Sequence, residues 1–175
     1  AWKTSLQKEA TAWNILHPSA WKTNLPKLEK MEDGSLFASG DFTKRDVYDL
    51  NFSSKEPITA LRIEAMTDER LPDLGPGRAY YEGRKGTFFL SEVDLFLSNG
   101  QEVSIQSPVA SSGHGPDKTI DNVGSSGWST SVGEEQHIIL PLATPIAANQ
   151  SFSLSLLLER HFVASLGRFR VSATS

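Results

Sequence analysis

The chain has 175 residues, contains no cysteine, and carries a formal net charge of −4 from interspersed Lys, Arg, Asp and Glu residues. This length suits one domain, the lack of cysteine excludes disulfides, thiolate metal sites and covalently attached haem within the chain, and the absence of a basic block argues against nucleic acid as a partner. The longest apolar run, around residues 154–158, is far shorter than the roughly 20 residues that cross a bilayer, so no membrane insertion is expected.

The N-terminal residues predict an extension in front of a single domain. The first residue is Ala1, and no basic stretch with an apolar segment follows it, so we expect a leader or an upstream domain to have been removed. Residues 1–12 are expected to form the extension, in which residues 5–12 could make a short helix, and residues 13–175 are expected to form the domain.

Strands are predicted along the rest of the chain by apolar side chains that alternate with polar ones. Two turn sequences, Asp33-Gly34 and Asn99-Gly100, are typical of two-residue hairpin loops. The expected strands lie at residues 28–31, 36–38, 48–52, 58–66, 89–97, 103–105, 136–140, 151–158 and 168–171. In the last one, Phe169 and Val171 would face inward, while Arg168 and Arg170 would reach solvent or a partner.

Eight or more strands joined by antiparallel-type turns, with no long stretch of helical periodicity, predict an all-β fold. We expect an antiparallel β-sandwich of the jelly-roll kind.

Two long irregular loops, at residues 67–87 and 107–135, are the expected location of function, because binding residues concentrate on loops that a rigid scaffold presents. The first loop carries Arg78, Tyr80, Tyr81 and Arg84. Flat aromatic faces can cover the C–H side of a sugar ring while charged groups bond its hydroxyls, so these residues are candidate ligand-binding residues. Trp128 in the second loop is either a second aromatic platform or a core residue that anchors its loop.

We expect no catalysis from this chain. The four histidines are scattered, and no nucleophile with its base and no metal-ligand spacing is visible. Loop carboxylates leave a glycosidase-type pair formally open.

The most specific signal lies in residues 110–128. It consists of Ala110-Ser111-Ser112, then Lys118-Thr119-Ile120-Asp121-Asn122, then Ser126-Gly127-Trp128. The segment resembles the discoidin, or factor five/eight type C, branch of galactose-binding-like β-sandwiches, although the Ser91-Glu92-Val93 strand here precedes the Asp loop. The resemblance implies a structural Ca²⁺ ion held by Glu92, Lys118, Asp121 and Ser126. The alternative is that Asp121 caps its loop by accepting bonds from backbone amides.

Over residues 13–174, the chain resembles a module of large planctomycete proteins that also carry c-type cytochrome domains. The motifs that carry this likeness include Leu71-Pro72, Gly75-Pro76-Gly77-Arg78, Ser91-Glu92 and Gly167-Arg168-Phe169-Arg170-Val171-Ser172. The resemblance implies an exported protein of the periplasm or cell surface, with sister domains in the full-length chain and a polysaccharide as the presumed ligand.

Together these features favour a non-catalytic carbohydrate-binding module that acts as a monomer and recognises a polysaccharide or glycan. The rival function is a docking module for sister domains or a protein partner, with Arg168 and Arg170 as contacts. A concave surface lined by exposed aromatic rings would favour the sugar, whereas a flat patch with an apolar centre would favour docking.

Overall fold

The computed structural model describes residues 11–130 and 133–175, and its regular structure is almost entirely β-strand. Sheet A has the strand order β3-β4-β13-β6-β11-β9, with β1 also paired to β13, and sheet B has the order β2-β5-β12-β8. All pairings are antiparallel, including that of the small β7-β10 sheet. The strands are β1 Asn14–Ile15, β2 Ala20–Thr23, β3 Lys27–Lys30, β4 Leu36–Ser39, β5 Arg45–Ser53, β6 Ile58–Ala65, β7 Phe89–Leu90, β8 Glu92–Leu97, β9 Val109–Ala110, β10 Trp128–Ser129, β11 Gln136–Ile146, β12 Ser151–Glu159 and β13 Arg168–Thr174. Two short 3-10 helices, η1 Pro72–Leu74 and η2 Pro116–Ile120, lie in the connections.

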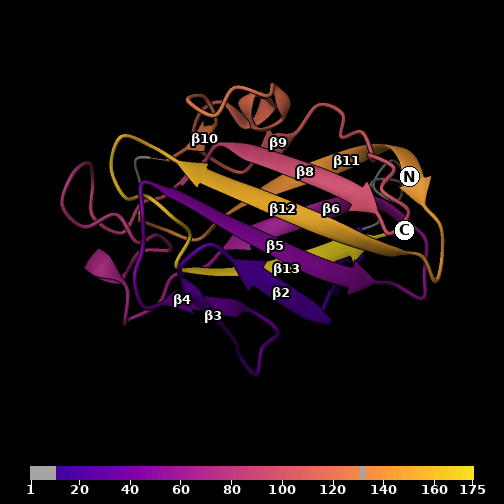
Figure 1. The fold of residues 1–175 in the computed structure, drawn as a ribbon, viewed down its shortest axis with the longest axis horizontal. Coiled ribbons are helices and arrows are strands. Elements are labelled where there is room, and N and C mark those ends of the chain that lie inside the picture. Colours follow the sequence, from indigo (N-terminus) through magenta and orange to yellow (C-terminus); the bar gives the residue numbers. More distant parts are fainter. Residues whose placement is uncertain (1–10, 131–132) are drawn as a thin grey trace, which may run out of the picture.

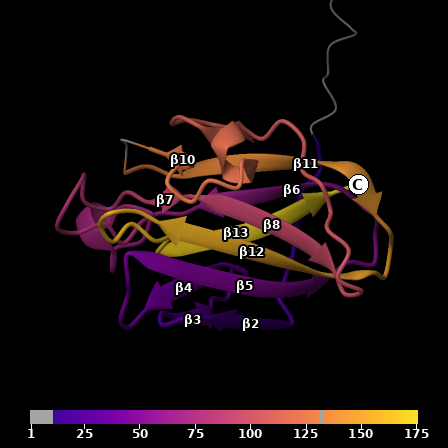
Figure 2. The same cartoon turned by 45° about the horizontal axis from the view of Figure 1, so that its top comes forward.

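The two sheets pack against each other and enclose one main core (Figures 1 and 2). Along β12, Phe152, Leu154, Leu156 and Leu158 are buried, while the residues between them are more exposed. The same alternation in β5 and β13 directs Tyr48 and Phe169 into the core, where their rings stack at 5.6 Å between centroids. The prediction of an all-β antiparallel sandwich is confirmed.

The first expected hairpin forms, but its loop is longer than the two residues predicted, because the Met31 N–H donates to the Ser35 carbonyl at 2.8 Å and leaves residues 32–34 between them. Antiparallel β3 and β4 flank Asp33-Gly34, and Gly34 has a φ of +81°, which an L side chain rarely adopts. The Asp33 Oδ1 atom accepts a hydrogen bond of 3.0 Å from the Ser35 N–H and so closes the turn.

The prediction of a strand at residues 103–105 is wrong. Only isolated bridges occur there, Phe96 with Glu102 and Ile105 with Leu142, because the segment crosses from the edge of sheet B to the edge of sheet A. It cannot pair along its length with either sheet. The strand expected at residues 89–97 is interrupted at Ser91, because Phe89–Leu90 pairs with β10 while β8 pairs with β12.

Arg168 and Arg170 do not project freely as expected. Arg168 bridges Asp33 and Asp68, with Nη2 2.6 Å from Asp33 Oδ2 and Nη1 3.4 Å from Asp68 Oδ2. Arg170 forms two bonds with the Glu64 carboxylate on neighbouring β6. Both guanidinium groups therefore stabilise the face of sheet A from within the chain.

Among the described residues, no helix is long and apolar enough to cross a membrane. The helix considered at residues 5–12 falls mainly in a part of the chain that lies outside the described residues.

Candidate functional site

The loop of residues 67–87 extends beyond the strand ends at the left of Figures 1 and 2, where it is drawn in magenta. Its backbone is nevertheless well fixed. Gly77 N–H donates to the Gly86 carbonyl at 2.8 Å, and Gly86 N–H donates to the Ala79 carbonyl at 2.8 Å. Arg78 N–H donates to Ser165, which ties the loop to the segment before β13. Residues 80–85 form the exposed tip.

A cleft of about 310 Å³ lies between this loop and the β4–β5 connection. We call it the aromatic cleft. Its lining consists of Phe37, Ala38, Ser39, Phe42, Arg70, Leu71, Pro72, Arg78 and Tyr80. The two central rings are substantially exposed, Phe42 by 46% and Tyr80 by 58%. The cleft is therefore a concave surface that carries two exposed aromatic rings.

Cationic side chains accompany each ring of the aromatic cleft. The Arg78 guanidinium carbon lies 4.8 Å from the Phe42 ring centroid, and the Arg70 guanidinium carbon lies 3.7 Å from that of Phe37. Lys85 Nζ lies 5.0 Å from the Tyr80 ring centroid. Such cation–π contacts hold the rings in fixed orientations.

Arg78 forms part of the cleft wall but is itself only 7% exposed. The expectation that it reaches out to ligand hydroxyls is corrected, because its Nη2 donates to the Gly40 carbonyl at 2.5 Å and so shapes the β4–β5 connection. Beneath it lies the buried Tyr48 hydroxyl, which donates to the Leu166 carbonyl at 2.9 Å. Burial raises the pKa of Tyr48 to about 12, although a hydrogen bond with Ser165 and the positive charge of Arg78 oppose the rise.

Arg70 is held by Asp68 in a bidentate pair, with Nε 2.7 Å from Oδ1 and Nη2 2.8 Å from Oδ2. The hydrogen bonds from Arg70 lower the pKa of Asp68 to about 2, although burial of Asp68 acts in the opposite direction. Because Asp68 also pairs with Arg168, a charged network runs from sheet A to the rim of the aromatic cleft. The network fixes the Arg70 guanidinium over Phe37.

Tyr81 and Arg84 lie at the exposed loop tip, and neither lines the aromatic cleft. Tyr81 is 94% exposed. The structure thus brings Tyr80 together with Arg78 and leaves the other two members of the expected quartet outside the concavity.

Trp128 does not form an aromatic platform, so that prediction is wrong. Its side chain is fully buried, packs edge-to-face on Phe88 at 4.9 Å, and donates from Nε1 to the Ser112 carbonyl at 2.8 Å. The alternative that it anchors its loop in the core is the correct one. An indole at the start of β10, paired with buried Leu90, faces inward like its strand neighbours.

Sequence reasoning missed Phe37, Phe42 and Arg70. Phe42 carried a usable signal, because it is a large apolar residue between the Gly40-Asp41 turn and polar Thr43-Lys44, outside any alternating pattern. Phe37 and Arg70 could not have been assigned, since they meet Phe42 only through the pairing of β4 with β13 and the path of the 67–87 loop.

The four residues expected to hold calcium lie together beside the start of β8. Asp121 accepts from the Ser126 hydroxyl at 2.9 and 3.0 Å and lies 3.9 Å from Lys118 Nζ. Glu92 Oε1 accepts from the Val123 N–H at 2.7 Å and shares a hydrogen bond with the Asp121 carboxyl group. Burial raises the pKa of Glu92, and the neighbouring Asp121 adds to the rise although backbone amides oppose it.

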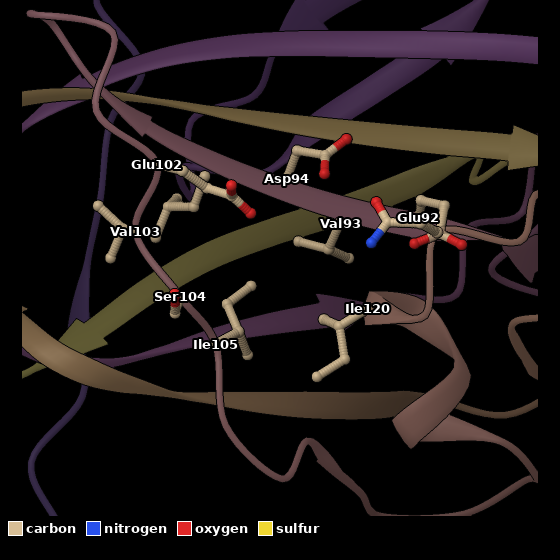
Figure 3. A pocket seen from close by; sticks show the side chains of 10 residues that line it. Glu92, Val93, Asp94, Glu102, Val103, Ser104, Ile105 and Ile120 are labelled. Atoms are coloured by element: carbon tan, nitrogen blue, oxygen red, sulfur yellow. The ribbon is translucent and has the colours of Figure 1, made fainter.

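A second, polar cleft of about 180 Å³ runs along β8 from this carboxyl pair. Figure 3 shows Asp94 between Glu92 and Glu102 on its wall. Burial, with a smaller contribution from Glu102, raises the pKa of Asp94. Among the residues described by the structure, no three acidic or histidine side chains converge to hold a metal ion.

Comparison with known proteins gives no family model and no curated protein that matches this chain. Among solved structures, similarity is found to the catalytic domain of a GH87 alpha-1,3-glucanase in complex with nigerose, with a TM-score of 0.40 and 9% identity over 95% of this chain. A variant of such a domain in complex with tetrasaccharides matches with a TM-score of 0.37 and 9% identity, again over 95% of this chain. The chain spans 28% and 29% of the length of these two structures.

These neighbours correct the expectation that the chain is not an enzyme. They are described as catalytic domains, so the sequence-based prediction that catalysis is absent is wrong. At this level of similarity the likeness assigns no reaction, ligand or residue role to the present chain.

Proposed function

We propose that this domain binds a polysaccharide or glycan in the aromatic cleft. The observation that carries the proposal is the position of two substantially exposed rings, Phe42 and Tyr80, on the wall of one concave site beside the Arg70 guanidinium. Aromatic faces pack against the C–H side of a sugar ring, and a fixed guanidinium group can donate to its oxygens. The rival docking function has less support, because Arg168 and Arg170 are engaged within the chain.

The test replaces each ring by alanine and measures binding to a panel of soluble polysaccharides by affinity electrophoresis. Tyr80→Ala and Phe42→Ala should each weaken binding about fivefold or more, since a packed aromatic contact is worth about 1 kcal/mol. Tyr81→Ala should have a smaller effect, because Tyr81 lies outside the cleft.

Phe96→Ala is the matched control, since Phe96 is 37% exposed but lies on β8, away from the aromatic cleft. All four variants should melt close to the unmodified protein because these rings are partly or largely solvated. Folded Tyr80→Ala and Phe42→Ala proteins that bind every polysaccharide as tightly as before would place the site elsewhere.

We also propose that Ca²⁺ stabilises the loop after η2 through Glu92 and Asp121. Two carboxyl groups in contact require either a shared proton or a cation between them, and hard oxygen ligands suit Ca²⁺. The Ser126 hydroxyl and the Lys118 carbonyl would supply further oxygens. When bound, the ion would neutralise the carboxylates and hold the loop against β8.

We infer from the sequence resemblance that the domain is a galactose-binding-like module of a larger exported protein that also contains cytochrome domains. Its expected location is the periplasm or the cell surface, and its expected state is a monomer with sister domains in the same chain.

A further inference from the structure

The lining of the aromatic cleft is basic, although the whole chain has a net charge of −4. It contains two guanidinium groups, from Arg70 and Arg78, and no carboxylate. Asp68 lies outside the lining and forms the bidentate pair that offsets Arg70. The charge of the cleft therefore depends mainly on Arg78.

Arg78 has no counter-ion within the described part of the chain: no carboxylate there forms an ion pair with it. Its Nη2 donates to a neutral carbonyl, that of Gly40, and its buried Nη1 has no hydrogen-bond partner. Asp46 is also buried and acts, like Arg78, on the Tyr48 hydroxyl; its Oδ1 accepts from the Thr43 N–H and hydroxyl, both at 2.9 Å, while its Oδ2 has no hydrogen-bond partner. Because Asp46 and Arg78 form no ion pair, an anion near the Arg78 guanidinium would offset part of the cost of burying it.

The exposed part of the cleft offers a place for such an anion. The Arg78 guanidinium carbon lies 4.8 Å from the centroid of the half-exposed Phe42 ring, and the Arg70 side chain is 45% exposed on the rim. Lys85 adds a third cationic group beside Tyr80. A guanidinium group with exposed N–H donors binds planar carboxylates and tetrahedral sulfate or phosphate groups through charge-assisted hydrogen bonds.

We propose that the aromatic cleft selects glycans that carry an oxyanion, either the carboxylate of a uronic acid or a sulfate ester, over neutral glycans. This inference rests on the proposed function and defines its ligand class. The rings of Phe42 and Tyr80 would take the apolar face of the sugar. The oxyanion would lie at the Arg70 rim, where the charge of Arg78 acts on it through the low-dielectric wall of the cleft.

The experiment uses probes that are matched except for charge. Binding of the unmodified protein is measured by isothermal titration to polygalacturonate and to its methyl-esterified form, and to dextran sulfate and dextran. We expect about tenfold tighter binding to at least one charged probe than to its neutral counterpart, and a several-fold loss when ionic strength rises from about 0.05 M to about 0.2 M. The two pairs distinguish carboxylate from sulfate recognition.

Arg78→Gln should weaken binding to the charged probe by a larger factor than binding to the neutral probe, because it removes the charge as well as a contact of the cleft wall. Lys55→Gln is its control, because Lys55 is exposed in the β5–β6 turn and its loss removes the same charge at the far end of β5. Since Arg78 is buried, its replacement can also destabilise the fold. Whether or not this variant folds, the proposal is decided by comparing how tightly the unmodified protein binds charged and neutral probes.

The outcomes separate this inference from the proposed function. Equal binding to charged and neutral probes, with both lost in Tyr80→Ala, would overturn the charge preference and leave glycan binding intact. Binding to charged probes that persists undiminished in Tyr80→Ala would overturn it as well, since the contact would then be diffuse surface attraction. No binding to any polysaccharide would overturn the proposed function itself.

Discussion

At the scale of single residues, the contact between Glu92 and Asp121 allows the proposed Ca²⁺ binding to be tested. A ligand bound only by the native state stabilises it by mass action, so removing Ca²⁺ with a chelator should lower the melting temperature by several degrees, and added Ca²⁺ should restore it. In Glu92→Gln the chelator should have no effect, because one of the two carboxylates is gone. Differential scanning fluorimetry measures both responses. If neither chelator nor Ca²⁺ changes the melting temperature of the unmodified protein, a shared proton alone joins the carboxyl groups of Glu92 and Asp121.

The candidate site could be predicted only in part from residue types. Tyr80 is predictable because two adjacent aromatic residues in a polar loop have no strand face to fill. Trp128 stays open between platform and core, because a loop residue that starts a short strand looks the same in sequence as an exposed one. A family resemblance, and not spacing, predicts that Asp121 and Glu92 meet, since 28 residues lie between them in the sequence. Local sequence carries the chemistry of each side chain, while the meeting of distant ones depends on the tertiary fold.

At the scale of elements, close backbone contact between two parts of the 67–87 loop holds the aromatic cleft in shape. A Cβ atom added at Gly77 would overlap the Thr87 carbonyl oxygen. Gly77→Ala should therefore separate the two parts, displace the Arg78–Tyr80 segment and destabilise the protein by about 1–3 kcal/mol, because the backbone must move to relieve the overlap.

Urea unfolding and polysaccharide binding measure the two effects of this substitution. Gly100→Ala is the control for a glycine with positive φ, because a Cβ there meets no atom within 4 Å. It should lose some stability through backbone strain and retain full binding. Equal losses of binding in the two variants would show that the close contact at Gly77 does not shape the site.

Strands with one buried and one solvated face were predictable, whereas the short edge strands β2 and β9 were not. In β5 and β12 the burial alternates residue by residue, so period two is visible in the sequence. In β2 the first three residues are exposed, because it is an edge strand of sheet B with little core to cover. Edge pairing of this kind depends on main-chain hydrogen bonds, which leave no mark on side-chain type.

At the scale of the whole molecule, the cleft lies at the opposite end of the sandwich from the β1–β13 pairing. β1 pairs with the end of β13, so residues 14–15 lie beside residues 172–173. The aromatic cleft lies beyond the start of β13 and of β5, at the other end of these strands. A neighbouring domain attached directly after residue 175 would therefore lie away from the cleft and leave it accessible to a polymer.

One shared core predicts that the molecule unfolds as a unit. Trp128 in the loop region packs into the same cluster as the strands of both sheets, so its environment should be lost at the temperature at which the sheets melt. The far-UV circular dichroism spectrum should be of the β type with little helix, and its melting curve should coincide with that of tryptophan fluorescence. Replacing Trp2, Trp13 and Trp21 together by Phe leaves Trp128 as the sole tryptophan of the sequence, and this coincidence should remain unchanged. A fluorescence transition well below the far-UV transition would instead show that residues 107–130 unfold separately, and that Trp128 does not join this loop to the core.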